Sequence, residues 1–344
     1  MLLCKTVLYF SIILTALSFV NVLNWRLFMN YIDFHCDTLS RLYYGHTSDP
    51  SETLWENKGH LDLTRLKNAG YLAQFFACFL YKASPSNNAN HFEDALGMIQ
   101  LMKDSLSQND SASLALSYAD YQKNKANGKL SCFLTVEEGG ILDGDMDRLE
   151  QLYKEGIRLI TLTWNFENAL GFPHLISDKP NTGLKPFGVE VVKQMEELGM
   201  LIDVSHLSDM GFWDVASNTT KPFIASHSCC RSLRGHSRNL TDDMLRRLGE
   251  RQGIVGINFY GDFLQNDGVC TLDALVHHLR HIINVGGLDI AALGTDFDGI
   301  GCELEIPGCE YMPRLDEALL ANGFLPSEVD AICTKNAERI LQLL

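Results

Sequence analysis

The sequence predicts a (β/α)8 barrel, the TIM-barrel fold of the α/β class, and three observations carry that prediction. Beyond residue 30, eight short apolar runs rich in β-branched and aromatic residues alternate with segments of helical periodicity. A chain of 344 residues is an ordinary length for such a barrel formed by a single domain. The alternative, an open doubly wound sheet, usually carries a glycine-rich turn after its first strand, and no G-x-G-x-x-G follows the first run here.

The eight apolar runs define the predicted strands in chain order. They span residues 31–34, 71–81, 130–137, 157–164, 201–206, 222–227, 253–260 and 290–297. Several of the helical stretches between them carry end signals: Ser208 or Asp209 begins one helix, Thr241 caps another, and Gly199 ends a third. The segment 82–129 is the longest insertion and contains more than one helical pattern.

Composition narrows the class of protein. The chain has 46% hydrophobic and 21% charged residues, which is typical of a globular protein that folds without stabilising cross-links. Its net charge of −15 argues against nucleic acid or an anionic membrane surface as the main partner. Ten cysteines without a C-x-x-C spacing predict buried free thiols, and hence a reducing, cytoplasmic location.

The first 28 residues differ from the rest of the chain. Residues 7–23 form one apolar run, which favours a signal sequence or a short membrane anchor. A third interpretation is that the working protein begins at Met29 and that residues 1–28 are an upstream extension. We therefore expect one catalytic domain over residues 29–344, located in the cytoplasm, with attachment to a membrane or export through the apolar run as the alternative.

Polar residues gather at the ends of five of the eight predicted strands. The first strand ends in "HCD", the third in "EE", the fifth and sixth in histidine, and the eighth in "DFD"; these residues are His35, Asp37, Glu137, Glu138, His206, His227, Asp296 and Asp298. In a barrel enzyme the carboxyl ends of the strands form the active-site face. Because burying unpaired charge or imidazole at a barrel mouth is costly, the set predicts a metal site.

The types of ligand narrow the choice of metal ion. Imidazole and carboxylate without thiolate suit zinc or a borderline ion such as manganese. Three histidines and two or more carboxylates exceed the ~3 protein ligands that a single catalytic zinc uses. Two ions that share a bridging carboxylate fit this count better.

Each residue also has an ordinary structural interpretation when taken alone. A single histidine such as His206 is more often hydrogen-bonded in a core, and Glu137 alone is equally well explained by a salt bridge. His277, His278 and His281 share one helical pattern and are interpreted as helix surface, while His46, His60, His91 and His174 have no ligand spacing. Ser228, Cys229 and Cys230 raise a nucleophile alternative, but no G-x-S-x-G or Cys–His framing supports it.

Six motifs in order resemble the membrane (renal) dipeptidase family of zinc dipeptidases, and the chain resembles a bacterial-type member of it. They are H-x-D after the first strand, V-E-x-G-G after the third, "ITLT", "IDVSH", the "SHS" segment with its "RN" pair, and "GTDFDG". Each motif is weak alone, but six in order from about residue 31 to the C-terminus are specific. The resemblance implies a (β/α)8 barrel with two zinc ions.

The same resemblance assigns the metal ligands. His35 and Asp37 would bind the first zinc, and His206 and His227 would bind the second. Glu137 would bridge both ions, and Glu138 takes that role if the alignment allows a one-residue gap.

The remaining roles also follow from the resemblance. Asp296 matches the acid–base aspartate, and Arg238, one of three arginines after the sixth strand with Arg231 and Arg234, matches the arginine that holds the substrate carboxylate. A zinc-activated hydroxide would then attack the peptide bond of a dipeptide. One position departs from the family pattern: Trp164 follows "ITLT", where better-known members carry a histidine, and indole cannot take up a proton.

Two alternatives to a dipeptidase stay open. The first is another barrel hydrolase of the amidohydrolase type, acting on lactones, phosphotriesters or N-acyl amino acids. The second is a metal-binding barrel that has lost turnover and acts as a binding protein, which the tryptophan at position 164 would suit. The partnerships left open beyond the substrate are a homodimer and membrane attachment through residues 7–23.

Overall fold

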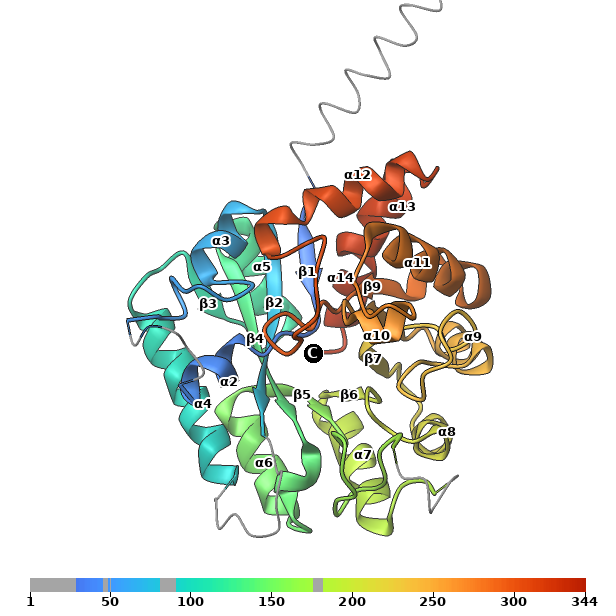
Figure 1. Cartoon of the computed structure of the whole chain (residues 1–344). Coiled ribbons are helices and arrows are strands. Elements are labelled where there is room, and N and C mark those ends of the chain that lie inside the picture. The colour runs from blue at the N-terminus through green and yellow to red at the C-terminus, as the bar shows by residue number, and fades with distance from the viewer. Residues whose placement is uncertain (1–28, 46–48, 50, 81–90, 176–181) are drawn as a thin grey trace, which may run out of the picture.

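The computed structural model describes residues 29–45, 49, 51–80, 91–175 and 182–344. Within these ranges the chain forms a closed barrel of eight parallel strands surrounded by helices, which confirms the predicted fold class (Figure 1). The predicted leader over residues 1–28 and His46 lie outside the described residues. Among the described residues, no helix is both long and apolar enough to cross a membrane.

All eight predicted strands are present. They are β1 (Tyr31–Asp33), β2 (Tyr71–Phe79), β4 (Leu130–Glu137), β5 (Ile157–Thr161), β6 (Leu201–Asp203), β7 (Ile224–Ser228), β8 (Ile254–Ile257) and β9 (Ala291–Leu293). Each pairs in parallel with its neighbours, and β1 closes the barrel by pairing with β9. Several strands end earlier than predicted, because the polar residues that follow them turn out of the sheet.

A ninth strand, β3 (Ala112–Leu114), was not predicted. It lies within the long insertion and pairs in parallel with Leu130–Cys132 of β4. β5 pairs with β4 only from Leu134 onward, so the first residues of β4 need another partner on that side. β3 supplies it, because backbone groups at a buried strand edge must be hydrogen-bonded.

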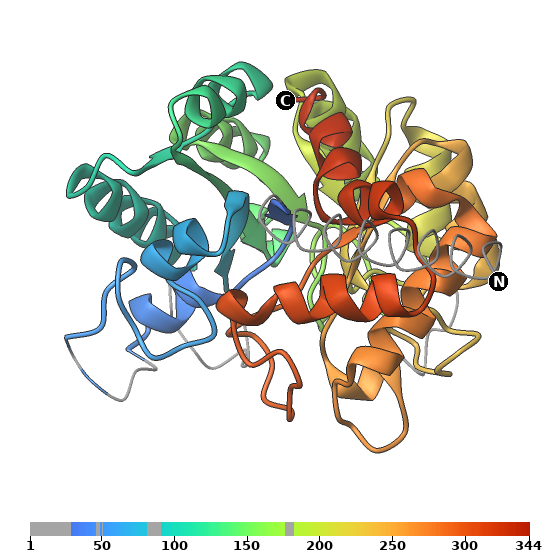
Figure 2. The same cartoon turned by 90° about the horizontal axis from the view of Figure 1, so that it is seen from above.

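Helices cover the outside of the barrel (Figures 1 and 2). They are α2 (Thr38–Tyr43), α3 (Leu63–Asn68), α4 (His91–Ser107), α5 (Tyr118–Ala126), α6 (Met146–Glu155), α7 (Pro186–Leu198), α8 (Asp209–Asn218), α9 (Asp242–Glu250), α10 (Gly261–Leu264), α11 (Leu272–Gly286), α12 (Pro313–Ala321), α13 (Pro326–Asp330) and α14 (Asn336–Leu341). Of the two cap candidates, Ser208 is the N-cap of α8, where its side chain accepts a hydrogen bond from the Gly211 amide. Thr241 caps α9 in the same way, and Gly199 ends α7 with a φ of 73°.

Two apolar clusters make up the core. The larger lies between the strands and the helices. The smaller contains at least one residue from every barrel strand, and therefore fills the barrel interior; Phe75 and Phe133 stack there with ring centroids 4.7 Å apart. Ala337, Ile340 and Leu341 from α14 belong to this interior cluster. The amino-terminal end of the barrel is thus packed with apolar side chains, which leaves the carboxyl ends of the strands for polar chemistry.

Candidate metal centre

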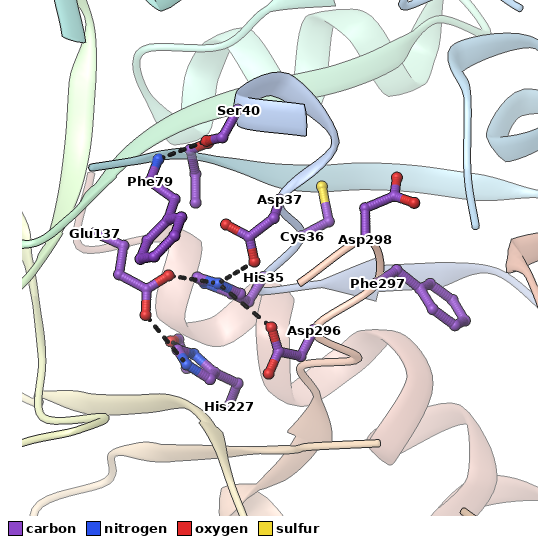
Figure 3. A network of polar contacts seen from close by, with 12 residues as sticks. His35, Cys36, Asp37, Ser40, Phe79, Glu137, His227, Asp296, Phe297 and Asp298 are labelled. Atoms are coloured by element: carbon purple, nitrogen blue, oxygen red, sulfur yellow. Dashed lines mark hydrogen bonds and ion pairs between the residues drawn. The ribbon is translucent and has the colours of Figure 1, made fainter. Parts of the chain in front are cut away.

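The structure brings the predicted ligands together at the carboxyl ends of the strands (Figure 3). His35, Asp37, Glu137, His206 and His227 are all at least nine-tenths buried. His35 and Glu137 approach to 3.0 Å between Nε2 and Oε2, and His206 Nε2 lies 3.1 Å from Glu137 Oε1. Side chains at or just after the ends of β1, β4, β6 and β7, far apart in sequence, therefore meet around one carboxylate.

The two oxygens of Glu137 face two different groups of side chains. Oε1 faces His206 and His227, whose Nε2 atoms lie 3.1 Å from each other. Oε2 faces His35, whose Nε2 lies 3.5 Å from Asp37 Oδ2 and 3.9 Å from Asp296 Oδ1. One carboxylate thus stands between a histidine pair and a group formed by one histidine with two aspartates.

The buried nitrogen and oxygen atoms of the site are better placed to bind a metal ion than to form hydrogen bonds with one another. His35 Nε2 faces three carboxylates, whereas Nδ1 of His35 and Oδ1 of Asp37 have no hydrogen-bond partner among the described residues. Buried polar atoms are rarely left in this condition, because each costs its full desolvation energy. In the described part of the chain, two sets of three potential ligand atoms lie within 4.8 Å of one another: His35–Glu137–His227 and His35–Asp37–Asp296. Nitrogen and oxygen donors without thiolate suit zinc and similar divalent ions.

Hydrogen bonds fix which nitrogen each imidazole presents. Asn165 Oδ1 lies 2.9 Å from His206 Nδ1, so that nitrogen carries the proton. Ser226 donates its hydroxyl proton to Asp203 Oδ2 at 2.6 Å, and therefore accepts from His227 Nδ1 at 2.7 Å. Both rings consequently direct a bare Nε2 at the centre, the arrangement that metal-binding histidines need.

Burial keeps these two rings neutral. It lowers the pKa of His206 to about 4, with a further contribution from the Arg238 charge. It also lowers the pKa of His227 well below its usual value, where the charges of His35 and Arg238 act in the same direction. Neutral imidazoles are the form that binds a metal ion.

Two buried aspartates hold the strand ends in register. Asp33 accepts from the amides of His35 and Thr295 and from the Thr295 hydroxyl at 2.6 Å, which ties β1 to β9. Asp203 accepts from the Ser226 amide and hydroxyl and from Thr161, which ties β6 to β7 and β5. Neither residue was predicted from the sequence; the signal that could have found them is an aspartate two or three positions before a candidate ligand.

Strained backbone conformations set the direction of several side chains at the site. Six described non-glycine residues have a positive φ, and four of them are at this face: Glu138, His206, Asp296 and Asp298. Such conformations cost about 1–3 kcal/mol each and persist where the surrounding structure enforces them. The turns explain why the strands end early and why residues next to one another in sequence point in different directions.

Asp296 lies beside the ligands with one oxygen held in place. Asn258 Nδ2 donates to its Oδ2 at 2.8 Å, and Oδ1 faces His35. Burial, together with the nearby charges of Asp37 and Glu137, raises the pKa of Asp296 to about 8 against the opposing effect of His35. A carboxyl group with such a pKa can both take up and release a proton near neutral pH.

Arg238 is the arginine of its loop that reaches the site. It is buried, and its guanidinium donates to the Ser228 hydroxyl at 2.9 Å and to the His227 carbonyl at 3.0 Å. Arg231 instead forms a two-bond ion pair with Asp209. Arg238 Nε has no partner among the described residues, and the guanidinium lies over the Phe263 ring at 5.5 Å.

Glu138 points away from the histidines. Its Oε1 accepts from the Gly140 amide at 2.7 Å and from Asn168 Nδ2, and its Oε2 accepts from the Trp164 amide at 3.0 Å. Glu138 therefore holds the loop after β5 instead of facing the ligands.

Other histidines differ from expectation. The prediction that His278 lies on a helix surface is wrong: its ring is buried and accepts from the Cys230 amide at 3.1 Å. Spacings of four residues from Ala274 and to Ile282 place it on the apolar face of α11. His174, thought to lack any signal, contacts Asn165 behind His206 at 3.1 Å.

The state of the cysteines agrees with the prediction of buried free thiols. All nine described cysteines are free and eight are buried. Burial raises the pKa of Cys229 to about 12, so its thiol stays protonated, and the nucleophile alternative gains no support.

Comparison with known proteins decides the family. A family model described as membrane dipeptidase, peptidase family M19, matches residues 27–343. The chain belongs to this family. A crystal structure of a metallopeptidase of family M19, dipeptidase AC, superposes with a TM-score of 0.82 at 28% identity, covering 91% of this chain and 98% of that one.

Two further relatives extend the comparison. A metallopeptidase from Rhodobacter sphaeroides, solved with a phosphinate mimic of L-Ala-D-Ala, has a TM-score of 0.82 at 27% identity, covering 91% of this chain and 99% of that one. An uncharacterized dipeptidase from Schizosaccharomyces pombe is 34% identical over 70% of this chain and 61% of its own length. The protein is accordingly a metal-dependent dipeptidase, as the sequence motifs predicted.

Proposed function

We propose that this dipeptidase hydrolyses the peptide bond of dipeptides at a centre of two zinc ions. The first ion would be held by His35 and Asp37, the second by His206 and His227, and Glu137 would bridge them. The observation that carries the proposal is the position of Glu137, whose Oε2 faces His35 while its Oε1 faces His206 and His227. When bound, such an ion pair activates water and polarises the substrate carbonyl.

The protein's own groups would handle the proton. Asp296 stands next to the ligands, fixed through Asn258. In the proposal it accepts a proton from the attacking water and delivers it to the amine that leaves. The position of its Oδ1 beside His35, with Oδ2 fixed by Asn258, supports both halves of this exchange.

Arg238 would hold the free carboxylate of the dipeptide. Its guanidinium is fixed by Ser228 and the His227 carbonyl, and the donors that these contacts leave suit a planar carboxylate. Holding that end positions the scissile bond over Glu137 and limits the substrate to short peptides. Trp164, at the position of the family histidine, can donate a hydrogen bond but cannot take up a proton, so Asp296 would carry the acid–base role alone.

The test is Asp296→Asn, a nearly isosteric change that removes the titrating group. We expect kcat/KM for dipeptides to fall by at least about 10³-fold, while elemental analysis still finds two zinc ions per chain. Asp143→Asn is the matched control, because Asp143 also has a positive φ but is exposed and remote. Retained hydrolysis in Asp296→Asn would refute the assigned role.

A substrate panel separates the dipeptidase from the other barrel hydrolases. Dipeptides, lactones, phosphotriesters and N-acyl amino acids are compared on the wild-type protein. Hydrolysis of dipeptides alone supports the proposal. Faster turnover of any other class, or one metal ion per chain in the active form, counts against it.

A further inference from the structure

The cavity above the ligands has an aromatic wall. It encloses about 820 Å³, and Phe79 and Trp164 line it together with Glu137. Phe79 ends β2, Trp164 follows β5, and their rings meet edge to face with centroids 5.1 Å apart. Phe166 lies beside Trp164 at 5.5 Å and is 41% exposed, so the apolar surface continues outward. Exposed aromatic faces in a cavity mark a binding surface for apolar groups.

This aromatic wall is held in place before any substrate arrives. The Trp164 amide donates to Glu138 Oε2, and Glu138 is itself tied to Gly140 and Asn168. On the other side, the Phe79 amide donates to the Ser40 hydroxyl at 2.7 Å (Figure 3). A rigid aromatic surface loses little conformational entropy when a ligand packs on it.

The wall lies across the barrel from Arg238. Phe79 ends β2 and Trp164 follows β5, the two barrel strands on either side of β4. Arg238 follows β7, and its guanidinium lies over Phe263, which follows β8. β4 and β8 are separated by three strands in either direction around the ring of eight. A dipeptide whose carboxylate lies at Arg238 and whose peptide bond lies over Glu137 therefore extends its amino-terminal residue toward Trp164.

We propose that Phe79, Trp164 and Phe166 form the subsite for the amino-terminal side chain, and that the enzyme prefers dipeptides beginning with an aromatic or large aliphatic residue. The proposal rests on the proposed function, because it uses Arg238 to set the direction of the substrate. It also gives the tryptophan a role: an indole in place of a histidine exchanges a polar contact for apolar contact area.

The test compares the ratio of kcat/KM for Phe-Gly to that for Gly-Gly. We expect a ratio of about 10 to 50 in the wild type, and a drop of about five- to tenfold in this ratio for Trp164→Ala and a smaller drop for Phe166→Ala. Using a ratio within one preparation removes the effect of inactive or misfolded protein. Tyr311→Ala is the control, since Tyr311 is 45% exposed and does not line the cavity.

A second pair of substrates tests the direction in which the dipeptide lies between Arg238 and Trp164. The ratio of Gly-Phe to Gly-Gly should change little in Trp164→Ala, because the carboxy-terminal residue faces Phe263. A wild-type ratio near one, or a ratio that Trp164→Ala leaves unchanged, overturns the subsite while the dipeptidase stands. If the wild type cleaves no dipeptide at all, the proposed function fails first and the subsite with it.

Discussion

The chain of hydrogen bonds behind His206 makes a sharp prediction about metal affinity. Asn165 Oδ1 accepts from His206 Nδ1 at 2.9 Å and from His174 Nε2 at 3.1 Å, and His174 Nδ1 meets the Ser237 hydroxyl at 2.8 Å. Asn165→Leu removes the shared acceptor. The buried Nδ1–H of His206 is then unpaired, or the ring changes tautomer and places a proton on the nitrogen that faces Glu137.

The size of the effect follows from that unpaired group. Leaving one buried donor unsatisfied costs about 1–3 kcal/mol, which corresponds to a loss of about 5- to 150-fold in affinity for the ion next to His206. His174→Phe leaves the bond between Asn165 and His206 in place, so the loss should be only about 2- to 10-fold. Zinc affinity is therefore expected to be lowest in Asn165→Leu, higher in His174→Phe and highest in the wild type.

The assay is competition for Zn²⁺ with a chromophoric chelator, with the absorbance spectrum of the Co²⁺-substituted protein as a second reading. Thermal unfolding of the metal-free proteins shows whether the fold itself is affected. Asn127→Leu is the control, since Asn127 is an exposed helix-end residue. Wild-type zinc affinity in Asn165→Leu, or a loss explained entirely by an unfolded apoprotein, would refute the reasoning.

Three further predictions concern other parts of the molecule. Arg238→Lys should lower kcat/KM for dipeptides by about 10- to 100-fold but leave the rate for dipeptide amides nearly unchanged; equal losses for both would contradict its role. Burial raises the pKa of Asp316 to about 6, so this group stabilises the fold below pH 4 and that stabilisation is lost as the pH rises through 6. In urea unfolding, the free energy of unfolding of Asp316→Asn minus that of the wild type should therefore be up to about 3 kcal/mol larger at pH 8 than at pH 4. An equal difference at both pH values would count against this prediction. A Cβ at Gly256 would lie 2.0 Å from the Ser226 carbonyl oxygen, so Gly256→Ala should lower the free energy of unfolding by about 1–3 kcal/mol, whereas Gly235→Ala, which meets nothing within 4 Å, should not.

Much of the fold could be predicted because it depends on local patterns. All eight barrel strands and the helix ends at Ser208, Thr241 and Gly199 follow from periodicity and capping, which act over a few residues. β3 could not be predicted, because three residues carry almost no periodicity and their pairing depends on where β5 joins β4. His278 was misplaced although its spacing from Ala274 marks the apolar face of α11, because its hydrogen-bond partners, the Cys230 amide and the Leu264 carbonyl, lie outside that helix.

The sequence by itself determined the chemical types at the strand ends. Histidine and carboxylate at five strand ends indicated a metal site, because parallel strands bring their carboxyl ends to one face. Only the tertiary structure decided which of two adjacent glutamates meets the histidines. Glu137 is the last residue of β4 and points to the centre, whereas Glu138 has a φ of 102° and turns to the loop. Asn165 and His174 likewise became visible only in space, since a hydrogen bond between distant loops leaves no spacing in the sequence.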